Sequence, residues 1–443
     1  MFRWVQNLWI SAFLVALPVT LGACSDESSS EDQPDVVGTG NEPVGFAIEL
    51  VGSVVEGTDF SLIVRTLGTS GGITQNYQGT VTLSTDWGDL AATDVVLTDG
   101  AGSVKTRLNR EGTAILTVTD GTLSGTAPID VGPPEWIRFP KSPVVRPNTK
   151  AIDPWAYGGT FGPSAVAVEG SIFVYFATTS EQKPNLTSND FVLGRARSDD
   201  GGLNFVFDPD EPIWTPADAN TSGLDDPMVL VAADGTWHMW YTSVAPDAKK
   251  SIGHATAPDG LAWVADDCLG LNSSIAIGWT GLGVAQPSVL EEEPGVFRMW
   301  FTGFGQGSGA EPEQRIGMTV GTCESGFTVA NIVFETGLTD SWEASRVFGV
   351  TVWREESVYK MLYSAGGFST TVNALGYATS ADGEQWTRSN GNPILTKFAN
   401  NNDCDHKGLA HPSTVLSADG KLLAFFATAP QDNRACIGRA HLP

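Results

Sequence analysis

The segment FGPSAVAV at residues 161–168 recurs four more times along the C-terminal part of the chain. The further copies are DDPMVLVA (225–232), AQPSVLEE (285–292), VFGVTVWR (347–354) and AHPSTVLS (410–417). Their reference positions, Pro163, Pro227, Pro287, Gly349 and Pro412, are 64, 60, 62 and 63 residues apart. A Leu-Gly or Ile-Gly pair follows each copy, with the glycine at Gly194, Gly253, Gly317, Gly376 and Gly438. Because both markers keep one period, the sequence indicates five copies of one structural unit.

Each unit of about 60 residues has room for four short strands, which is one blade of a β-propeller. A blade exposes sheet faces that only its neighbours cover, so a ring of five blades must close. The chain ends just after the third strand of blade five, in IGRAHL (437–442). The segment SPVVRP (142–147) resembles the fourth-strand segments EPIWTP (211–216) and NPILTK (392–397). We therefore expect residues 135–147 to complete the last blade of a propeller that spans residues 133–443.

The N-terminal residues predict export. Residues 1–23 carry Arg3 and then an apolar run, which is typical of a signal peptide. The run ends in Leu-Gly-Ala-Cys (21–24), which resembles the lipobox of bacterial lipoproteins and implies lipidation of Cys24. Residues 24–44 are rich in acidic and polar residues and are expected to form a disordered tether. These features predict a lipoprotein anchored to the bacterial cell envelope, at the outer membrane or cell surface.

Residues 45–132 read as short alternating strands separated by turns, for example FSLIVRTL (60–67) and TAILTV (113–118). The strings YQGTVTLST (77–85) and DGAGSVKTRLNREGTAILTVTDG (99–121) resemble bacterial immunoglobulin-like domains. The predicted fold is therefore all-β, with an Ig-like β-sandwich followed by a five-bladed β-propeller. A spacer is the favoured role of the sandwich, and adhesion is the alternative.

Charge narrows the classes of partner. The chain holds 25 Lys+Arg against 51 Asp+Glu, a formal net charge of −26. Nucleic acid is excluded as a partner, because phosphate contacts need clustered basic residues. We expect a monomer that meets the membrane only through its lipid anchor, with a poly- or oligosaccharide as the partner.

Cysteine parity is consistent with an exported protein. Once Cys24 is set aside, four cysteines remain. Their places in the repeat suggest the disulfides Cys268–Cys323 and Cys404–Cys436, with four buried thiols as the alternative. No CxxC motif is present, so the sequence indicates no metal site.

The propeller also resembles a known superfamily. Asp-Pro starts of inner strands and S-x-D-G-x-x-W turns such as SADGEQWT (380–387) are similar to those of the arabinanase, levansucrase and invertase glycosidases, and the mannoside phosphorylases share the fold. The resemblance implies three carboxylates, one from each of the first three blades, at one mouth of the channel. Two of them would act across a glycosidic bond, one protonated and one ionised.

This sequence matches that carboxylate pattern in part. Asp226 stands at the family's aspartate in blade two, but blade one has Gly162 and blade three has Gln286 at the corresponding positions. Asp153, upstream of blade one, and Glu343, before blade four, are the nearest replacements. The catalytic candidates are therefore Asp226, Asp153 and Glu343.

Four further residues are candidates for binding substrate: Trp155, Gln286, Arg346 and His411. Trp155 offers an aromatic face to a sugar ring. His411 stands where arabinanase-like propellers hold a histidine near a central calcium, so the resemblance implies a calcium ion there. No other cofactor is expected.

Three hypotheses for function follow. The chain is a surface glycoside hydrolase with a rearranged acid/base set, a glycan-binding propeller without catalysis, or a propeller scaffold that binds protein. The missing acids of blades one and three shift the balance from the first hypothesis to the second.

Overall fold

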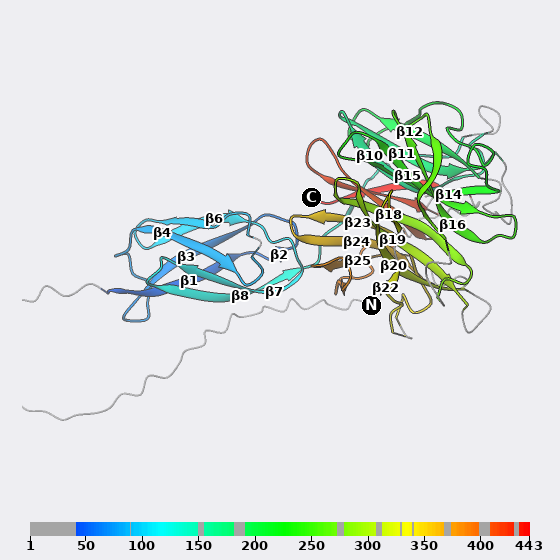
Figure 1. Cartoon of the computed structure of the whole chain (residues 1–443). Coiled ribbons are helices and arrows are strands. Elements are labelled where there is room, and N and C mark those ends of the chain that lie inside the picture. The colour runs from blue at the N-terminus through cyan, green and yellow to red at the C-terminus, as the bar shows by residue number, and fades with distance from the viewer. Residues whose placement is uncertain are drawn as a thin grey trace, which may run out of the picture.

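The structure is a computed structural model that describes residues 41–88, 90–148, 155–180, 191–272, 279–306, 312–327, 330–338, 341–366, 374–397, 408–428 and 434–443. Within these ranges every regular element is a β-strand, which confirms the predicted all-β class. No helix in this part of the chain is long and apolar enough for a membrane span. Figure 1 shows two bodies, one formed by β1–β8 and the other by the later strands.

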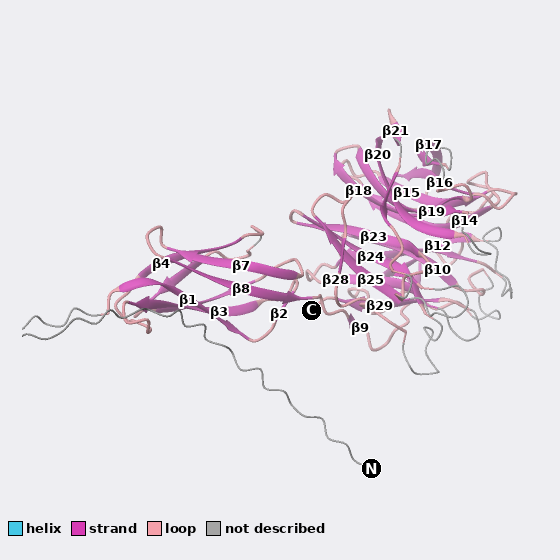
Figure 2. Cartoon of the chain, turned by 90° about the horizontal axis from the view of Figure 1, so that it is seen from below, coloured by secondary structure: helices cyan, strands magenta, loops and turns pink. Residues whose placement is uncertain are grey.

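The N-terminal body consists of two sheets of mainly antiparallel strands that run along its length (Figure 2). One sheet has the order β1 (Pro43–Val51), β3 (Phe60–Gly68) and β6 (Ala101–Thr106). The other has the order β2 (Val54–Val55), β8 (Ser124–Gly132), β7 (Gly112–Thr119), β4 (Gly79–Thr85) and β5 (Asp94–Leu97). Alternate residues of β3 and β7 point into one apolar cluster, which is why period-two segments of sequence form this body. The first strand of this body, β1, begins at Pro43.

The repeat forms five units with the same strand order. The inner strands are β10 (Thr160–Val168), β14 (Gly223–Val231), β18 (Gly283–Glu293), β23 (Val347–Glu355) and β27 (Leu409–Leu416). The second strands are β11 (Ser171–Thr178), β15 (Trp237–Val244), β19 (Val296–Gly305), β24 (Val358–Ala365) and β28 (Leu422–Thr428). The third strands are β12 (Val192–Ser198), β16 (Lys250–Ala257), β20 (Glu313–Thr322), β25 (Ala374–Ser380) and β29 (Cys436–His441). The outer strands are β13 (Val206–Phe207), β17 (Val264–Leu271), β21 (Gly326–Phe327) with β22 (Asn331–Phe334), β26 (Thr387–Arg388) and β9 (Ile137–Arg138).

The glycine of each Leu-Gly or Ile-Gly pair has a steric cause. In every unit it lies directly opposite an aromatic residue of the second strand, as Gly253 does opposite Tyr241. A Cβ on Gly253 would lie 2.3 Å from the ring of Tyr241, and one on Gly438 would lie 2.4 Å from the ring of Phe426. The aromatic side chain therefore lies flat across the third strand only where that strand has no side chain.

The five inner strands follow one another in a closed ring, because β10 packs against β14 at one side and against β27 at the other. A separate apolar cluster fills each junction between neighbouring units, including the junction of the last unit with the first. Since these faces are covered only by the next unit, burial of apolar surface stabilises the ring as a whole.

The last unit takes its outer strand from far upstream in the sequence. β9 pairs antiparallel with β29, and Val145 forms a bridge with Ile437. The segments around Trp214 and Leu395 make the same bridge to Leu193 and Leu375 in two other units. The three similar segments of the sequence thus occupy equivalent places, and the open edge of β29 is covered.

The two bodies meet through a buried ion pair. Lys360 Nζ of β24 lies 2.9 Å from Glu56 Oε1, and both side chains are almost fully buried. The hydroxyl of Tyr377 donates a hydrogen bond to the same carboxylate. Glu355 Oε2 lies 2.6 Å from Lys360 Nζ. The N-terminal body is therefore attached at the end of the ring where the inner strands finish.

Candidate functional site

A ring of five residues forms the centre of the candidate site. Each inner strand has a β-bulge at the residue that precedes or replaces the reference proline. The bulged residues all have left-handed backbones: Gly162 (φ 49°), Asp226 (φ 43°), Gln286 (φ 57°), Gly349 (φ 51°) and His411 (φ 52°). A bulge re-aims the side chain of its residue. This conformation is uncommon for residues other than glycine, so its use by Asp, Gln and His marks these positions as special.

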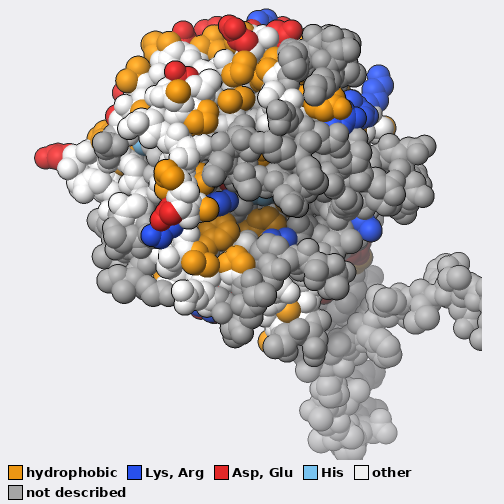
Figure 3. All heavy atoms as spheres, turned by 90° about the vertical axis from the view of Figure 1, so that its right-hand side faces the viewer, with side chains coloured by type: hydrophobic (Ala, Val, Ile, Leu, Met, Phe, Trp, Pro, Cys, Tyr) orange, Lys and Arg blue, Asp and Glu red, His pale blue; other side chains and the backbone are white. Residues whose placement is uncertain are grey.

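These five residues and their neighbours line a small cavity of about 30 Å³. That space corresponds to about one water molecule. A sugar therefore has to lie outside the ring, at a face of the molecule. Figure 3 shows the face away from the N-terminal body, where hydrophobic side chains gather with basic side chains beside them.

Asp226 is held by two partners within the ring. His411 Nδ1 lies 2.9 Å from its Oδ1, and Thr242 Oγ1 donates to its Oδ2 at 3.1 Å. Burial acts to raise the pKa of Asp226, but the charge and hydrogen bond of His411 outweigh it and lower the pKa. Burial likewise acts to lower the pKa of His411, and the charge and hydrogen bond of Asp226 outweigh it and raise that pKa. The geometry therefore favours a carboxylate–imidazolium pair.

Gln286 belongs to the same network through Thr242. Its backbone N–H donates to Thr242 Oγ1 at 3.0 Å, and its side-chain Oε1 accepts from the backbone N–H of Gly349 at 3.0 Å. Thr242 thus connects Asp226 with Gln286. The amide of Gln286 stabilises the next inner strand, so the structure gives this residue a defined partner inside the ring.

Gly162 is glycine because Asp226 occupies the adjacent space. A Cβ on Gly162 would lie 2.9 Å from Asp226 Oδ1 and 3.0 Å from its Cα. The carboxylate that the family resemblance implies for this unit therefore has no room while Asp226 stands where it does.

A second carboxyl group lies next to Asp226 and was not among the predicted site residues. Asp225 Oδ1 accepts a hydrogen bond from the backbone N–H of Asp226 at 2.9 Å. Burial, and then the charge of Asp226, raises the pKa of Asp225 to about 7, although Lys250 and His411 oppose the shift. The Asp-Asp-Pro sequence at residues 225–227 is the signal that could have identified this pair.

Arg346 reaches the network through an aromatic ring. Its guanidinium carbon lies 4.5 Å from the ring centre of Phe348, which meets the ring of His411 edge to face at 5.7 Å. Arg346 is itself 9% exposed. Asp226, Gln286, His411 and Arg346 are therefore connected by direct contacts or through one intervening residue.

Two other predicted residues lie in structural clusters. Glu343 Oε2 accepts from Arg388 Nε of β26 at 3.0 Å and also interacts with Tyr363, so the contacts seen for it hold the outer part of its unit together. Trp155 packs on Phe176 and Phe207, and a Cβ on Gly194 would lie 2.7 Å from its ring. None of these described contacts is with a residue of the ring.

The remaining predicted site residues are cysteines and Asp153. Cys268 and Cys323 form a disulfide across 55 residues of sequence. Cys436 is disulfide-bonded, and its expected partner Cys404 lies outside the described residues. Asp153 and Cys24 also lie outside them.

The ring does not fit a calcium ion bound directly by His411. Calcium takes six to eight oxygen ligands. His411 Nδ1 contacts Asp226 Oδ1, and Thr242 Oγ1 donates to Asp226 Oδ2. The remaining side-chain oxygen, Gln286 Oε1, accepts a hydrogen bond from the backbone N–H of Gly349. The ring residues therefore do not form the oxygen-rich ligand set that a calcium ion needs at this position.

A larger cavity of about 350 Å³ lies beyond the ring, along the inner strands. Its walls combine aliphatic residues such as Val229 and Val289 with the hydroxyl groups that follow the reference prolines. Several of those hydroxyls accept backbone hydrogen bonds from the next unit, as Ser164 Oγ does from Val229 N at 2.8 Å. This cavity is mainly a feature of how the units pack.

No protein-family model and no curated protein sequence matches the chain. Solved structures share its fold. A glycosyl hydrolase from Bacteroides ovatus is 16% identical with a TM-score of 0.54, over 70% of this chain and 93% of that one. The β-1,2-mannobiose phosphorylase from Listeria innocua is 14% identical with a TM-score of 0.53, over 69% and 96%. A thermostable family-43 glycoside hydrolase is 16% identical with a TM-score of 0.51, over 64% and 90%. The chain therefore contains a glycosidase-type propeller fold.

Proposed function

We propose that this chain is a lipoprotein of the bacterial envelope whose five-bladed propeller binds a carbohydrate without hydrolysing it. The five-fold repeat, the closed ring of inner strands and the fold shared with glycoside hydrolases support the propeller. The sequence at residues 21–24 and the acidic segment that follows support the anchor and tether. The N-terminal body, with its two sheets around one core, would be the Ig-like spacer that carries the propeller away from the membrane.

One observation favours binding of a carbohydrate over its hydrolysis. Among the five ring residues a single one is acidic, and both of its carboxylate oxygens contact other residues of the protein. Glycoside hydrolysis needs two carboxyl groups on either side of the glycosidic bond, about 5–10 Å apart. Asp225 does not supply the second group across a sugar, because it adjoins Asp226 on the same strand. The ring therefore retains the geometry of the fold without its acid/base pair.

The carbohydrate would bind at the mouth where the inner strands begin. Asp225 and Lys250 stand at that end of β14 and β16, and Arg346 directly precedes β23. Both charge signs are thus present, which suits the hydroxyl groups of a sugar. The network of Asp226, His411 and Thr242 lies next to these groups in the ring and would hold them in position.

The proposal is tested by a glycan screen of the full chain in mild detergent, scored for both binding and release of sugar product. Wild type is compared with Asp225→Asn and with Asp234→Asn, a matched change in the exposed turn at the far end of β14. We expect wild type and Asp234→Asn to bind the same glycans without product, and Asp225→Asn to bind at least about tenfold more weakly, as for the loss of a charged hydrogen bond.

Product release by wild type that Asp225→Asn or Asp226→Asn abolishes would overturn the non-catalytic proposal and establish a glycoside hydrolase. Failure to bind any glycan on an array that covers plant, fungal and bacterial polysaccharides would also contradict it. That outcome would favour a propeller that binds protein.

A further inference from the structure

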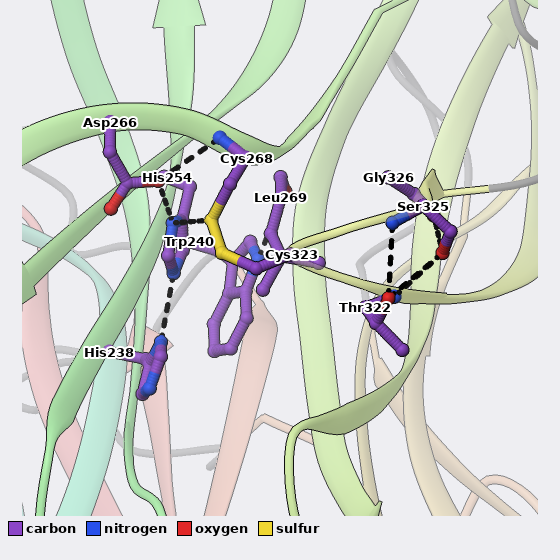
Figure 4. The surroundings of a disulfide bond; sticks show 10 residues. All are labelled: His238, Trp240, His254, Asp266, Cys268, Leu269, Thr322, Cys323, Ser325 and Gly326. Carbon is purple, nitrogen blue, oxygen red and sulfur yellow. Dashed lines mark hydrogen bonds and ion pairs between the residues drawn. A yellow bond between two sulfur atoms is a disulfide. The ribbon is translucent and has the colours of Figure 1, made fainter.

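A cluster of potential metal ligands lies at the outer edge of the second and third units, apart from the ring. His254 of β16 is paired across the strands with Asp266 of β17, and its Nδ1 lies 2.6 Å from Asp266 Oδ1. Cys268 follows on β17, with its Sγ 3.8 Å from the same Nδ1. Figure 4 shows these three side chains converging on the disulfide that Cys268 makes with Cys323.

We propose that reduction of the Cys268–Cys323 disulfide opens a site for Zn²⁺ or a similar borderline-soft cation, with both thiolates, His254 Nδ1 and a carboxylate oxygen of Asp266 as ligands. A disulfide sulfur is a poor ligand, whereas two thiolates, an imidazole and a carboxylate form a four-ligand set that suits tetrahedral zinc. The site is separate from the proposed carbohydrate site and does not depend on it.

The distances agree with such a site. Zinc–nitrogen bonds of about 2.0–2.1 Å and zinc–sulfur bonds of about 2.3 Å place the two ligand atoms about 3.5 Å apart in a tetrahedron. The observed separation of His254 Nδ1 and Cys268 Sγ is 3.8 Å. The ligand-bearing atoms of His254, Asp266 and Cys268 all lie within 4.8 Å of one another. Reduction lets the two sulfurs separate, which provides the space for an ion between them.

His238 would act as the positioning residue of this site. Its Nδ1 lies 3.0 Å from His254 Nε2, and it is 9% exposed whereas His254 is 1% exposed. With a metal on Nδ1, His254 carries its proton on Nε2 and donates it to His238 Nδ1. Metal-bound histidines commonly donate their second N–H in this way, which fixes the tautomer and the ring orientation.

Metal binding at this site would require a reductant that cleaves the disulfide. An external dithiol attacks the disulfide, transfers two electrons and becomes a disulfide itself, while Cys268 and Cys323 become thiols. Zn²⁺ then displaces one proton from each thiol as the two Zn–S bonds form. Cys323 is an exposed residue whereas Cys268 is half-buried, so we expect the dithiol to attack the sulfur of Cys323. In an oxidising compartment the disulfide form persists, and metal binding would follow exposure to thiol reductants.

The test measures Zn²⁺ uptake by the purified full chain, using competition with a chromophoric chelator. The oxidised protein is compared with protein reduced anaerobically by a phosphine. Reduced wild type is expected to bind about one more Zn²⁺ per chain than the oxidised form. Co²⁺ should give the intense visible and thiolate charge-transfer bands of a tetrahedral thiolate site, and it should quench Trp240, whose ring centre is 4.9 Å from that of His254.

Matched variants identify the ligands. Cys404→Ser/Cys436→Ser lacks the other cysteines of the propeller and should keep the reduction-dependent uptake. Cys268→Ser/Cys323→Ser should lose it, and His254→Gln should weaken it. His238→Gln keeps all four ligands and should bind about 10–100-fold more weakly.

Equal Zn²⁺ uptake by the oxidised and reduced wild type would overturn the proposal. So would uptake that persists in Cys268→Ser/Cys323→Ser or that is lost in Cys404→Ser/Cys436→Ser. Because His238→Gln and Asp266→Asn retain the disulfide, they test the site even where the cysteine variants fail to fold. Co²⁺ spectra and an affinity for Co²⁺ that are the same in these two variants as in the wild type would contradict the proposed site.

Discussion

His411 Nδ1 and Asp226 Oδ1 lie 2.9 Å apart although their strands, β27 and β14, are not neighbours in the ring. Both strands pack against β10, and the pair passes over its Gly162. The contact therefore joins the second unit to the fifth across the first. The contact also occupies the carboxylate of Asp226 and the imidazole of His411, which would otherwise face a ligand. This geometry supports the proposed lack of catalysis.

Replacing His411 by Gln should destabilise the protein in a pH-dependent manner. The raised pKa of His411 means that its contribution is fully present below its ordinary value of 6.5 and is lost as the pH rises through the folded-state value. The lowered pKa of Asp226 means that its contribution is present above its ordinary value of 3.8 and is lost as the pH falls through its folded-state value. Between these limits His411→Gln should cost about 3 kcal/mol, as for loss of one partner of a buried pair.

The measurement is the free energy of unfolding in denaturant at a series of pH values. The difference between wild type and His411→Gln should narrow as the solution becomes alkaline. A difference that stays constant between about pH 5 and pH 9 would show that the pair is not charged in the folded protein.

Introducing the absent carboxylate at Gly162 should fail for a steric and electrostatic reason. Gly162→Asp places a second acid against Asp226 Oδ1 at a position where φ is 49°. We expect a loss of about 2–4 kcal/mol, larger than that of Gly162→Ala, which adds the Cβ without the charge. The double variant Gly162→Asp/Asp226→Gly should recover part of the loss, because the acid then has space. Additive losses in a thermal-unfolding comparison of Gly162→Asp, Asp226→Gly and the double variant would contradict this interpretation of the ring.

The sequence predicts the architecture of the repeat because its markers have strong steric causes. The Leu-Gly and Ile-Gly pairs leave room for an aromatic ring, and the reference prolines follow the bulge in four of the five inner strands. Both requirements recur in every unit, so they are visible as a period. The segment at residues 142–147 resembles its counterparts for the same reason, since each forms one bridge to the residue before the repeat glycine.

The candidate site is less predictable because side-chain partners come from different units. The engagement of Asp226 by His411 depends on a contact between residues 185 positions apart in the sequence. The raised pKa of Asp225 depends on its burial in the folded protein, which the residues next to it in the sequence do not reveal. Likewise, Cys268 and His254 have no metal-binding spacing in the sequence, and only the pairing of β16 with β17 brings them together.

Removing the hydroxyl of Ser413 should weaken the closure of the ring. Ser413 Oγ of β27 accepts a hydrogen bond from the backbone N–H of Ala165 in β10 at 2.9 Å, which connects the last unit with the first. Ser413→Ala leaves this N–H without its partner and should cost about 1–3 kcal/mol. Ser288→Ala is the matched control, because Ser288 Oγ accepts from Val352 N at 2.9 Å between units that are consecutive in the chain.

Amide hydrogen exchange distinguishes the two sites. Ser413→Ala should accelerate exchange in β10, β27 and β29, whereas Ser288→Ala should accelerate it in β18 and β23. If both variants show the same pattern of exchange, Ser413 has no particular role in closing the ring between the last unit and the first.

The attachment of the N-terminal body should depend on the charge of Lys360. Lys360→Met leaves the carboxylate of Glu56 buried with Tyr377 as its remaining side-chain donor, next to the acidic Glu355. Truncating one partner of a buried ion pair costs about 3–5 kcal/mol. We expect this loss as a lower unfolding temperature and as separate calorimetric transitions for the two bodies.

The pH dependence of the Lys360 variant follows from Glu56. Burial raises the pKa of Glu56 even in the wild type, where the charge of Lys360 opposes the shift. Without Lys360 the raised pKa favours the folded state at acid pH, and that contribution is lost as the pH rises. Lys360→Met should therefore be closest to wild type at acid pH. Glu56→Gln/Lys360→Met should be more stable than Lys360→Met at neutral pH, since it has no unpaired carboxylate at residue 56. If the double variant is the less stable of the two, the contact does not depend on charge.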